Sequence, residues 1–404
     1  MKIIVQKYGG SSVADPEKLK KIAQIVASVK SEGYGVIVVV SAMGKTTNSL
    51  IELANNISSD PSRRELDMLL SAGERITMSL LCMALNDLKV DAISLTGSQA
   101  GIITDDRHND ARVIEVRPIR VQDEMDKGKV VVVGGFQGVS YKKDVTTLGR
   151  GGSDTSAVAL AAALNAERCE IYSDVDGVYT ADPSLVKEAK HLKEISYQQM
   201  QEMSSAGAKV LNAQAVQFAK EAGIVIHARS SFNPGAETVI KTSKAGKHKG
   251  ITGVVHELDI VRVILSYKSS TDDFYELLKN MEEKQVSVKE LNVAEAENRE
   301  INSKASFIVS YKNIYGWEKF KEKLVDNFGD KIEFDYDLGA LSIIGEGLNR
   351  DNETLLASLD VLKNENIKVY GITTTSYRIS FLVARDDLQR SVLIIHKKWI
   401  EESA

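Results

Sequence analysis

Residues 148–164 read LGRGGSDTSAVALAAAL, and this stretch decides how the rest of the chain is interpreted. Three glycines surround Arg150, and the hydroxyl and acidic residues at 153–156 lead into an alanine-rich run. Glycines let backbone N–H groups converge on one point, and a helix start adds unpaired N–H groups and the positive end of the helix dipole. The pattern predicts a loop that receives an anion at a helix start. An ordinary glycine-rich turn before a capped helix is the alternative.

Length and composition indicate a globular protein of two or three domains, because the chain has 404 residues. No apolar run is long enough to cross a bilayer and the N-terminus lacks a signal-peptide core, so we expect a cytoplasmic location. A net charge of -5 argues against a broad nucleic-acid surface. Cys82, Cys169 and the six scattered histidines show no metal-ligand spacing, which favours buried reduced thiols and no metal site.

The first 240 residues alternate short β-branched runs with helical patterns. This order predicts a three-layer αβα fold with a mostly parallel sheet, because runs such as VIVVV at 36–40 are apolar on both faces. Strands are expected at residues 3–6, 36–40, 92–95, 130–133, 170–172 and 224–228. Ligands should gather where such strands end, and the segments that follow most of them carry glycine, hydroxyls or charge. Asp15 and Pro16 predict the cap and first residue of a helix that runs to about Lys30.

The last 150 residues follow a different pattern. Residues 241–250, KTSKAGKHKG, read as a linker, with a phosphate-binding basic patch as the alternative. Beyond it we expect strands at 261–265, 286–292, 306–311 and 332–336 with helices at 272–284 and 315–327, then strands at 340–344, 368–373 and 378–383 with helices at 352–364 and 387–399. The recurring order predicts two α+β units that bind small molecules or serve as dimerisation modules.

Two nucleotide-binding signatures are not matched, because each lacks a glycine at a required position. Gly44, Lys45 and Thr46 match the end of a P-loop, yet Val39 stands where its first glycine is needed. The GRGGSD segment has Asp154 in place of the third glycine of the dinucleotide fingerprint. A nucleotide therefore binds, if at all, by another geometry.

Ordered motifs along essentially the whole chain resemble those of the aspartokinases, within the amino-acid kinase superfamily. They are KYGGSSV at 7–13, SAMGKTT at 41–47, LLSAGERIT at 69–77, TGSQAGIITDDRHNDARV at 96–113, VVVVGGFQGV at 130–139, TTLGRGGSDTSAVALAAAL at 146–164, IYSDVDGVYTADP at 171–183 and GAKVL at 207–211. The resemblance implies an amino-acid kinase catalytic domain at 1–245 and two ACT-like (βαββαβ) units at 251–336 and 337–404, with 251–256 as a strand that completes the second unit. It also implies a homodimer or higher homo-oligomer, with an amino-acid effector as a candidate ligand of the ACT-like units. The net charge and the lack of a long apolar run argue against a nucleic-acid or membrane partner.

The activity that the resemblance implies is ATP-dependent phosphorylation of the β-carboxylate of L-aspartate, the first step towards lysine, threonine, methionine and diaminopimelate. ATP brings Mg²⁺ with it, and phosphoryl transfer requires mainly positioning and charge neutralisation. The implied catalytic residues are Lys7 and Asp154. The implied aspartate-binding residues are Ser41, Thr47, Glu74, Arg150, Gly151, Gly152 and Ser153. The implied nucleotide-binding residues are Lys7, Gly9, Gly10, Ser173, Asp174, Tyr179, Asp182 and Lys209.

Residue context alone leaves other interpretations open. Lys7 also fits a solvated strand end, Glu74 a helix-surface neighbour of Arg75, and residues 174–177 ordinary turn chemistry. The chain departs from the family pattern at Ser98, Ser184, Asn212 and Ala213, and the segments 266–274 and 345–353 lack the Pro-Gly pair at which an effector docks. Whether lysine, threonine, diaminopimelate or no effector regulates the chain is therefore not implied. The rival functions are a kinase of glutamate or N-acetylglutamate and a non-catalytic amino-acid sensor.

Overall fold

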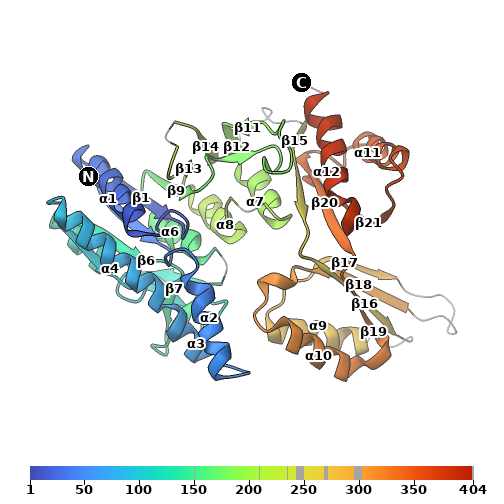
Figure 1. Ribbon diagram of the computed structural model, residues 1–404, viewed down its shortest axis with the longest axis horizontal. Helices are drawn as coiled ribbons and strands as arrows, with labels where there is room; N and C mark the ends of the chain where they lie inside the picture. The colour runs from blue at the N-terminus through green and yellow to red at the C-terminus, as the bar shows by residue number, and fades with distance from the viewer. Residues whose placement is uncertain are drawn as a thin grey trace. The chain divides into compact units, whose positions relative to one another are not determined.

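The computed structural model describes residues 1–149, 151–208, 210–233, 235–242, 250–267, 272–294 and 303–402. The chain forms two compact units, and each unit is built from separate segments of the sequence. The first contains Met1–Tyr179, Lys190–Ser205 and Lys209–Lys247, and the second contains Thr180–Ala189, Ala206–Ala208 and His248–Ala404. Strands β1 to β14 belong to the first unit and strands β15 to β22 to the second. Figure 1 shows the chain with labels on many of these elements.

An eight-stranded sheet forms the centre of the first unit. Its strands are, in spatial order, β12 (Glu194–Ser196), β14 (Glu237–Lys241), β13 (Ile226–Ser230), β9 (Arg168–Ser173), β1 (Ile3–Tyr8), β2 (Gly35–Val40), β6 (Val130–Gly134) and β3 (Ala92–Leu95). All neighbouring pairs are parallel except β13 and β14. All six residues of β2 are buried, as expected for a central strand covered on both faces.

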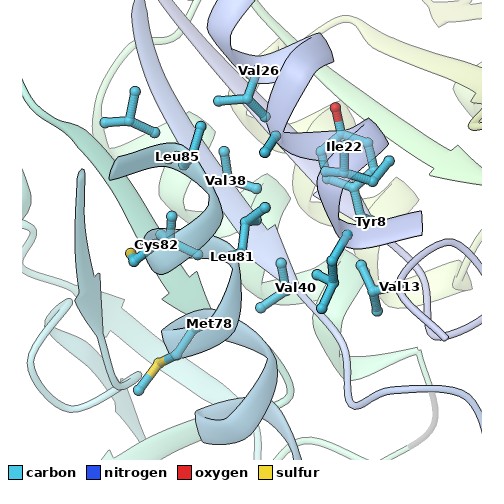
Figure 2. Close-up of a cluster of buried hydrophobic side chains, with 14 of the residues drawn as sticks. Tyr8, Val13, Ile22, Val26, Val38, Val40, Met78, Leu81, Cys82 and Leu85 are labelled. Atoms are coloured by element: carbon cyan, nitrogen blue, oxygen red, sulfur yellow. The ribbon is translucent and has the colours of Figure 1, made fainter. Parts of the chain in front are cut away.

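Helices α1 (Pro16–Ser31) and α4 (Ala72–Asp87) cover one face of this sheet. Because side chains alternate along a strand, Val36, Val38 and Val40 point to this face. Figure 2 shows the resulting core, in which Val38 and Val40 lie beside Ile22 and Val26 of α1 and Leu81 and Leu85 of α4. Asp15 caps α1 as predicted, since its Oδ1 accepts the Lys18 N–H at 2.9 Å.

The other face is covered by α6 (Gly152–Ala163), which contacts β1, β2, β9 and α8 (Ala213–Ala222). Every residue from 152 to 161 is buried, because the small alanine side chains let the helix lie close to the sheet. The remaining helices of the unit are α2 (Thr46–Ile57), α3 (Arg63–Leu70), α5 (Ile119–Asp126) and α7 (Tyr197–Ser205). The predicted three-layer α/β class is confirmed.

Two small sheets in the first unit were not predicted. One has the order β5 (Val113–Val116), β4 (Ile102–Thr104), β7 (Gln137–Ser140) and β8 (Val145–Thr147), and the other pairs β10 (Val178–Tyr179) with β11 (His191–Leu192). Strands of two to four residues carry too little alternation to be visible in the sequence. The first of these sheets leads directly into the glycine-rich stretch, since β8 ends at Thr147.

The second unit contains two four-stranded antiparallel sheets. The first has the order β17 (Lys289–Ala294), β18 (Ser303–Val309), β16 (Val261–Tyr267) and β19 (Ile332–Asp335), with helices α9 (Asp272–Lys284) and α10 (Trp317–Phe328). The second has the order β15 (Gly250–Glu257), β20 (Leu338–Glu346), β22 (Arg378–Ala384) and β21 (Val369–Thr374), with helices α11 (Glu353–Asn364) and α12 (Leu388–His396). Strand β15 precedes all strands of the first sheet in the sequence, yet it pairs antiparallel with β20 and so belongs to the second sheet.

Some boundaries differ from the predicted ones. The strand expected from residue 286 begins at Lys289, and the helix expected over 387–399 ends as α12 at His396 and continues as the turn η4 (Lys397–Glu401). The other short helical turns are η1 (Tyr311–Asn313), η2 (Gly329–Lys331) and η3 (Arg385–Asp387). Most of the expected linker, residues 243–249, lies outside the described residues.

The helical stretch Arg63–Asp87, formed by α3 and α4, is long and apolar enough to span a membrane by length and composition. This finding differs from the expectation that no apolar run is long enough to cross a bilayer. Glu74 and Arg75 interrupt the run of apolar residues, whereas the helix continues through them. Half of the apolar window is buried inside the fold, and core helices of soluble proteins share these properties.

Candidate active site

The carboxyl ends of the parallel strands meet at one edge of the large sheet, where the sequence analysis expected ligands. Backbone hydrogen bonds join the segments that leave these strands. The Gly9 N–H donates to the Tyr172 carbonyl at 3.1 Å, the Ser41 N–H to the Tyr8 carbonyl at 3.1 Å and the Gly135 N–H to the Val40 carbonyl at 2.9 Å. This edge therefore brings together loops that are far apart in the sequence.

Lys7 and Asp154 form an ion pair at this edge. The Lys7 Nζ lies 2.7 Å from Asp154 Oδ1, and the side chains are only 12% and 9% exposed. Lys7 belongs to β1 and Asp154 to the first turn of α6. A buried charge without its partner is strongly destabilising. Each of the two side chains therefore keeps its partner, and Asp154 holds the Lys7 ammonium group in place.

The glycine-rich loop before α6 requires its glycines for two physical reasons. Gly149 and Gly151 have φ angles of 69° and 70°, in the left-handed region that favours glycine. A Cβ on Gly151 would lie 2.5 Å from Asn212 Nδ2, and one on Gly152 would lie 2.7 Å from the Leu148 Cβ. The loop is thus fixed against its neighbours. Arg150, the predicted carboxylate ligand, lies outside the described residues.

The loops after β1 and β2 approach each other closely. A Cβ on Gly10 would lie 2.9 Å from the Ala42 carbonyl oxygen, and the Gly44 N–H donates to the Gly10 carbonyl at 3.0 Å. Ser41 Oγ donates to Ser153 Oγ at 3.0 Å and so links the β2 loop to α6. Thr47, in the first turn of α2, is half-buried.

Glu74 is buried on α4 and offers an unsatisfied oxygen. Its side-chain Oε1 accepts the Ala42 N–H at 3.0 Å, whereas Oε2 has no hydrogen-bond partner within the described part of the chain. Burial raises the pKa of this carboxyl to about 7, against the lowering effect of its backbone hydrogen bonds. A buried polar atom without a partner is costly, which suits a site that a ligand donor completes.

The residues predicted on the nucleotide side are less tightly grouped. Ser173 Oγ contacts the backbone of Val175, Asp174 is exposed, and Tyr179 OH donates to Asp176 Oδ1 at 2.8 Å. Asp182 belongs to the second unit. Its Oδ1 accepts hydrogen bonds from the Ser184 N–H at 2.9 Å and from the Ser184 hydroxyl at 2.6 Å. Lys209 lies outside the described residues.

Several polar residues beside these loops were missed by the sequence analysis. Ser231 Oγ donates to Ser12 Oγ at 2.6 Å, and the Ser231 N–H donates to the Ser173 carbonyl at 2.9 Å. Asp67 of α3, which is fully buried, accepts hydrogen bonds from Asn109 and Thr147. Ser231 directly follows β13, which was a usable signal, whereas Asp67 contacts partners that sequence spacing does not reveal.

One departure from the family pattern has a local explanation. Asn212 caps α8, because its Oδ1 accepts the N–H groups of Gln214 and Ala215 at 2.8 and 3.3 Å. Asparagine is among the best residues at this position. The substitution therefore serves the helix that packs against α6.

Comparison with known proteins assigns the family. The model of the amino acid kinase family matches residues 2–230. The aspartokinase of Mycolicibacterium smegmatis is 39% identical over 405 residues, covering 98% of this chain and 96% of that protein. Aspartokinase 2 of Bacillus subtilis is 39% identical over 402 residues, with 98% and 97% covered. The chain belongs to the aspartokinases of the amino acid kinase family.

A solved aspartokinase shares the fold as well. The structure of E. coli aspartokinase III in complex with aspartate and ADP has a TM-score of 0.85 at 24% identity, and the match covers 98% of this chain and 99% of that one. Membership of the aspartokinases, inferred above from ordered motifs, is confirmed by the 39% identity to the two relatives over nearly the whole chain.

Proposed function

We propose that this chain transfers the γ-phosphoryl group of ATP to the β-carboxylate of L-aspartate, giving 4-phospho-L-aspartate and ADP. The observation that carries the proposal is the arrangement around the glycine-rich loop, where Lys7 pairs with Asp154 at 2.7 Å and the buried Glu74 keeps one oxygen without a partner among the described residues. The names of the similar proteins support the same reaction.

Each group has a role in this reaction. A β-carboxylate oxygen attacks the γ-phosphorus, a new P–O bond forms, the bond to the bridging oxygen breaks and ADP leaves. Lys7, held by Asp154, neutralises the charge that spreads over the transferring group. Mg²⁺ enters with ATP as part of that substrate. No residue of the chain has to form a covalent bond.

The amino-acid substrate is held by its charged ends. Glu74 Oε2 and Asp154 attract the α-amino group, and Arg150 binds the α-carboxylate through its forked guanidinium. Ser41, Thr47 and Ser153 supply hydroxyl contacts, with the backbone of Gly151 and Gly152 beside them. Gly9 and Gly10 cradle phosphate, and Ser173, Asp174, Tyr179, Asp182 and Lys209 bind the nucleotide.

The remaining parts of the chain complete the proposal. Residues 1–245 form the catalytic domain, residues 251–336 and 337–404 the ACT-like units, and strand β15 completes the second of these by pairing with β20. The units bind an amino-acid effector and join two copies of the chain in a homodimer. The enzyme works in the cytoplasm, at the first step towards lysine, threonine, methionine and diaminopimelate.

Trapping of the acyl phosphate tests the function. The protein is incubated with Mg-ATP, hydroxylamine and either L-aspartate, L-glutamate or N-acetyl-L-glutamate, and the hydroxamates are identified by mass spectrometry. Aspartyl hydroxamate should form together with an equal amount of ADP. Product from glutamate or N-acetylglutamate in place of aspartate would assign the chain to the rival kinases, and no product from any of them would favour an amino-acid sensor.

A further inference from the structure

Asp67 is a buried carboxylate to which the proposed reaction gives no role. Its side chain has no exposed area and lies on α3, outside the glycine-rich loop and the strand ends. The Asp67 carboxylate accepts three hydrogen bonds, from the Thr147 hydroxyl at 2.5 Å, from the Asn109 side-chain amide at 2.6 Å and from the Asn109 backbone N–H at 3.1 Å. Its Oδ2 also lies 2.7 Å from His108 Nδ1. Charge-assisted hydrogen bonds of this number fix the geometry of a group, because leaving any donor unpaired inside the protein is costly.

The partners of Asp67 lead directly to the glycine-rich loop. Thr147 is the last residue of β8, two positions before Gly149. Asn109 precedes Asp110, whose Oδ1 lies 2.6 Å from the place that a Cβ on Gly149 would occupy. The Ala111 N–H donates to the Thr147 carbonyl at 2.9 Å and joins the two segments. Asp67 thus holds both the strand that enters the loop and the segment that packs against it.

The same helical stretch carries Glu74. The Ser71 N–H donates to the Asp67 carbonyl at 3.0 Å where α3 ends, and α4 begins at Ala72. The Gln137 side chain donates to the Ser71 carbonyl at 3.1 Å and fixes this junction. Asp67 therefore connects the helical stretch that supplies Glu74 to the loop that leads into α6, whose first turn supplies Ser153 and Asp154.

We infer that Asp67 is a positioning residue for the amino-acid substrate, because it locks the helix of Glu74 to the glycine-rich loop. The inference rests on the proposed function, which places the two ends of aspartate between these elements. Asp67 acts through Thr147 and Asn109 and does not touch the substrate. The contacts described for Ser173 and Tyr179 do not pass through Asp67, so its effect is confined to the aspartate side.

The test separates positioning from general stability. Thr147→Val keeps the shape of the side chain and removes the donor, Thr147→Ser keeps the hydroxyl, and Asp67→Asn replaces an acceptor oxygen with a donor that faces other donors. Tyr197→Phe is the matched control, because it removes another buried hydrogen bond of the same unit, the one from Tyr197 OH to the Ile224 carbonyl at 2.6 Å, near the amino end of β13. For each variant, KM for aspartate, KM for Mg-ATP, kcat and the melting temperature are measured.

We expect Thr147→Val and Asp67→Asn to raise KM for aspartate about ten- to a hundredfold while KM for Mg-ATP changes less than about twofold, since small displacements of a positioned group have effects of this size. Thr147→Ser should restore KM for aspartate, and Tyr197→Phe should lower only the melting temperature. If both KM values change together, or if KM for aspartate is unchanged in an active enzyme, the positioning role is wrong. A wild-type chain that does not phosphorylate aspartate overturns the proposed function and this role with it.

Discussion

The Nζ of Lys7 lies 2.7 Å from Oδ1 of Asp154, and this ion pair joins the carboxyl end of β1 to the first turn of α6. This contact places a cation beside the point where the glycine-rich loop becomes a helix. The helix start adds its own positive dipole end to the same place. Negative charge that develops on a transferring phosphoryl group would be stabilised here.

Lys7→Met should therefore lower kcat by about a thousandfold, because it removes a preorganised charge from the transition state. The methionine keeps the length of the side chain, and steady-state kinetics with melting curves separate lost catalysis from lost folding. Lys2→Met is the matched control, since Lys2 lies near the opposite end of β1 in an exposed ion pair with Glu167. Such surface pairs contribute little, so the control should stay fully active. Equal activity of both variants would contradict the role of Lys7.

KM for aspartate should depend on pH through Glu74. Burial raises the pKa of this carboxyl to about 7, so the free enzyme carries a neutral Glu74 below that pH and a carboxylate above it. In the proposed function only the carboxylate attracts the α-amino group of aspartate. KM for aspartate should therefore rise about tenfold per pH unit as the pH falls below 7, because the fraction of enzyme with an ionised Glu74 falls in proportion.

Two variants assign this pH dependence. Glu74→Gln should have a high KM for aspartate with no inflection near pH 7. Asp110→Asn should keep the inflection, although burial also raises the pKa of Asp110, to about 6. An inflection that survives in Glu74→Gln and disappears in Asp110→Asn would assign the titrating group to Asp110 and contradict the prediction.

Gly10→Ala should abolish most activity, because its Cβ would lie 2.9 Å from the Ala42 carbonyl oxygen and would push the β1 and β2 loops apart. Gly128→Ala is the control, since Gly128 has a φ of 83° but open space around it. That control should cost about 1 kcal/mol of stability and leave kcat unchanged. Comparable kcat values for the two variants would show that the close approach of these loops is dispensable.

Much of the fold could be predicted because the decisive signals are local. Asp15 and Pro16 mark the start of α1 by their chemistry, and the valine runs of β2 and β6 require burial on both faces. The short strands β4, β5, β7 and β8 could not be predicted, since they hold together by pairing with each other. That residues 251–256 complete the second unit came from the resemblance to the aspartokinases, because no local signal in this segment shows that β15 pairs with β20, more than eighty residues away.

The candidate site also contains residues that could be predicted from the sequence and residues that could not. The resemblance to the aspartokinases pointed to Lys7, Asp154, Ser41, Ser153 and Glu74, and the structure brings these residues to one edge of the sheet. Asp67 was missed because an aspartate inside a helical pattern reads as a surface residue. Its burial becomes visible only when β8 and the segment of Asn109 fold against α3.

Isotope transfer from the substrate carboxylate tests the central claim most directly. L-Aspartate labelled with ¹⁸O in its β-carboxylate is incubated with Mg-ATP and the wild-type protein, hydroxylamine releases phosphate from the acyl phosphate, and the phosphate is analysed by mass spectrometry. Each released phosphate should carry one ¹⁸O atom, because the attacking carboxylate oxygen stays bonded to phosphorus. Phosphate without label would show that water accepted the phosphoryl group, and aspartate would not be the substrate.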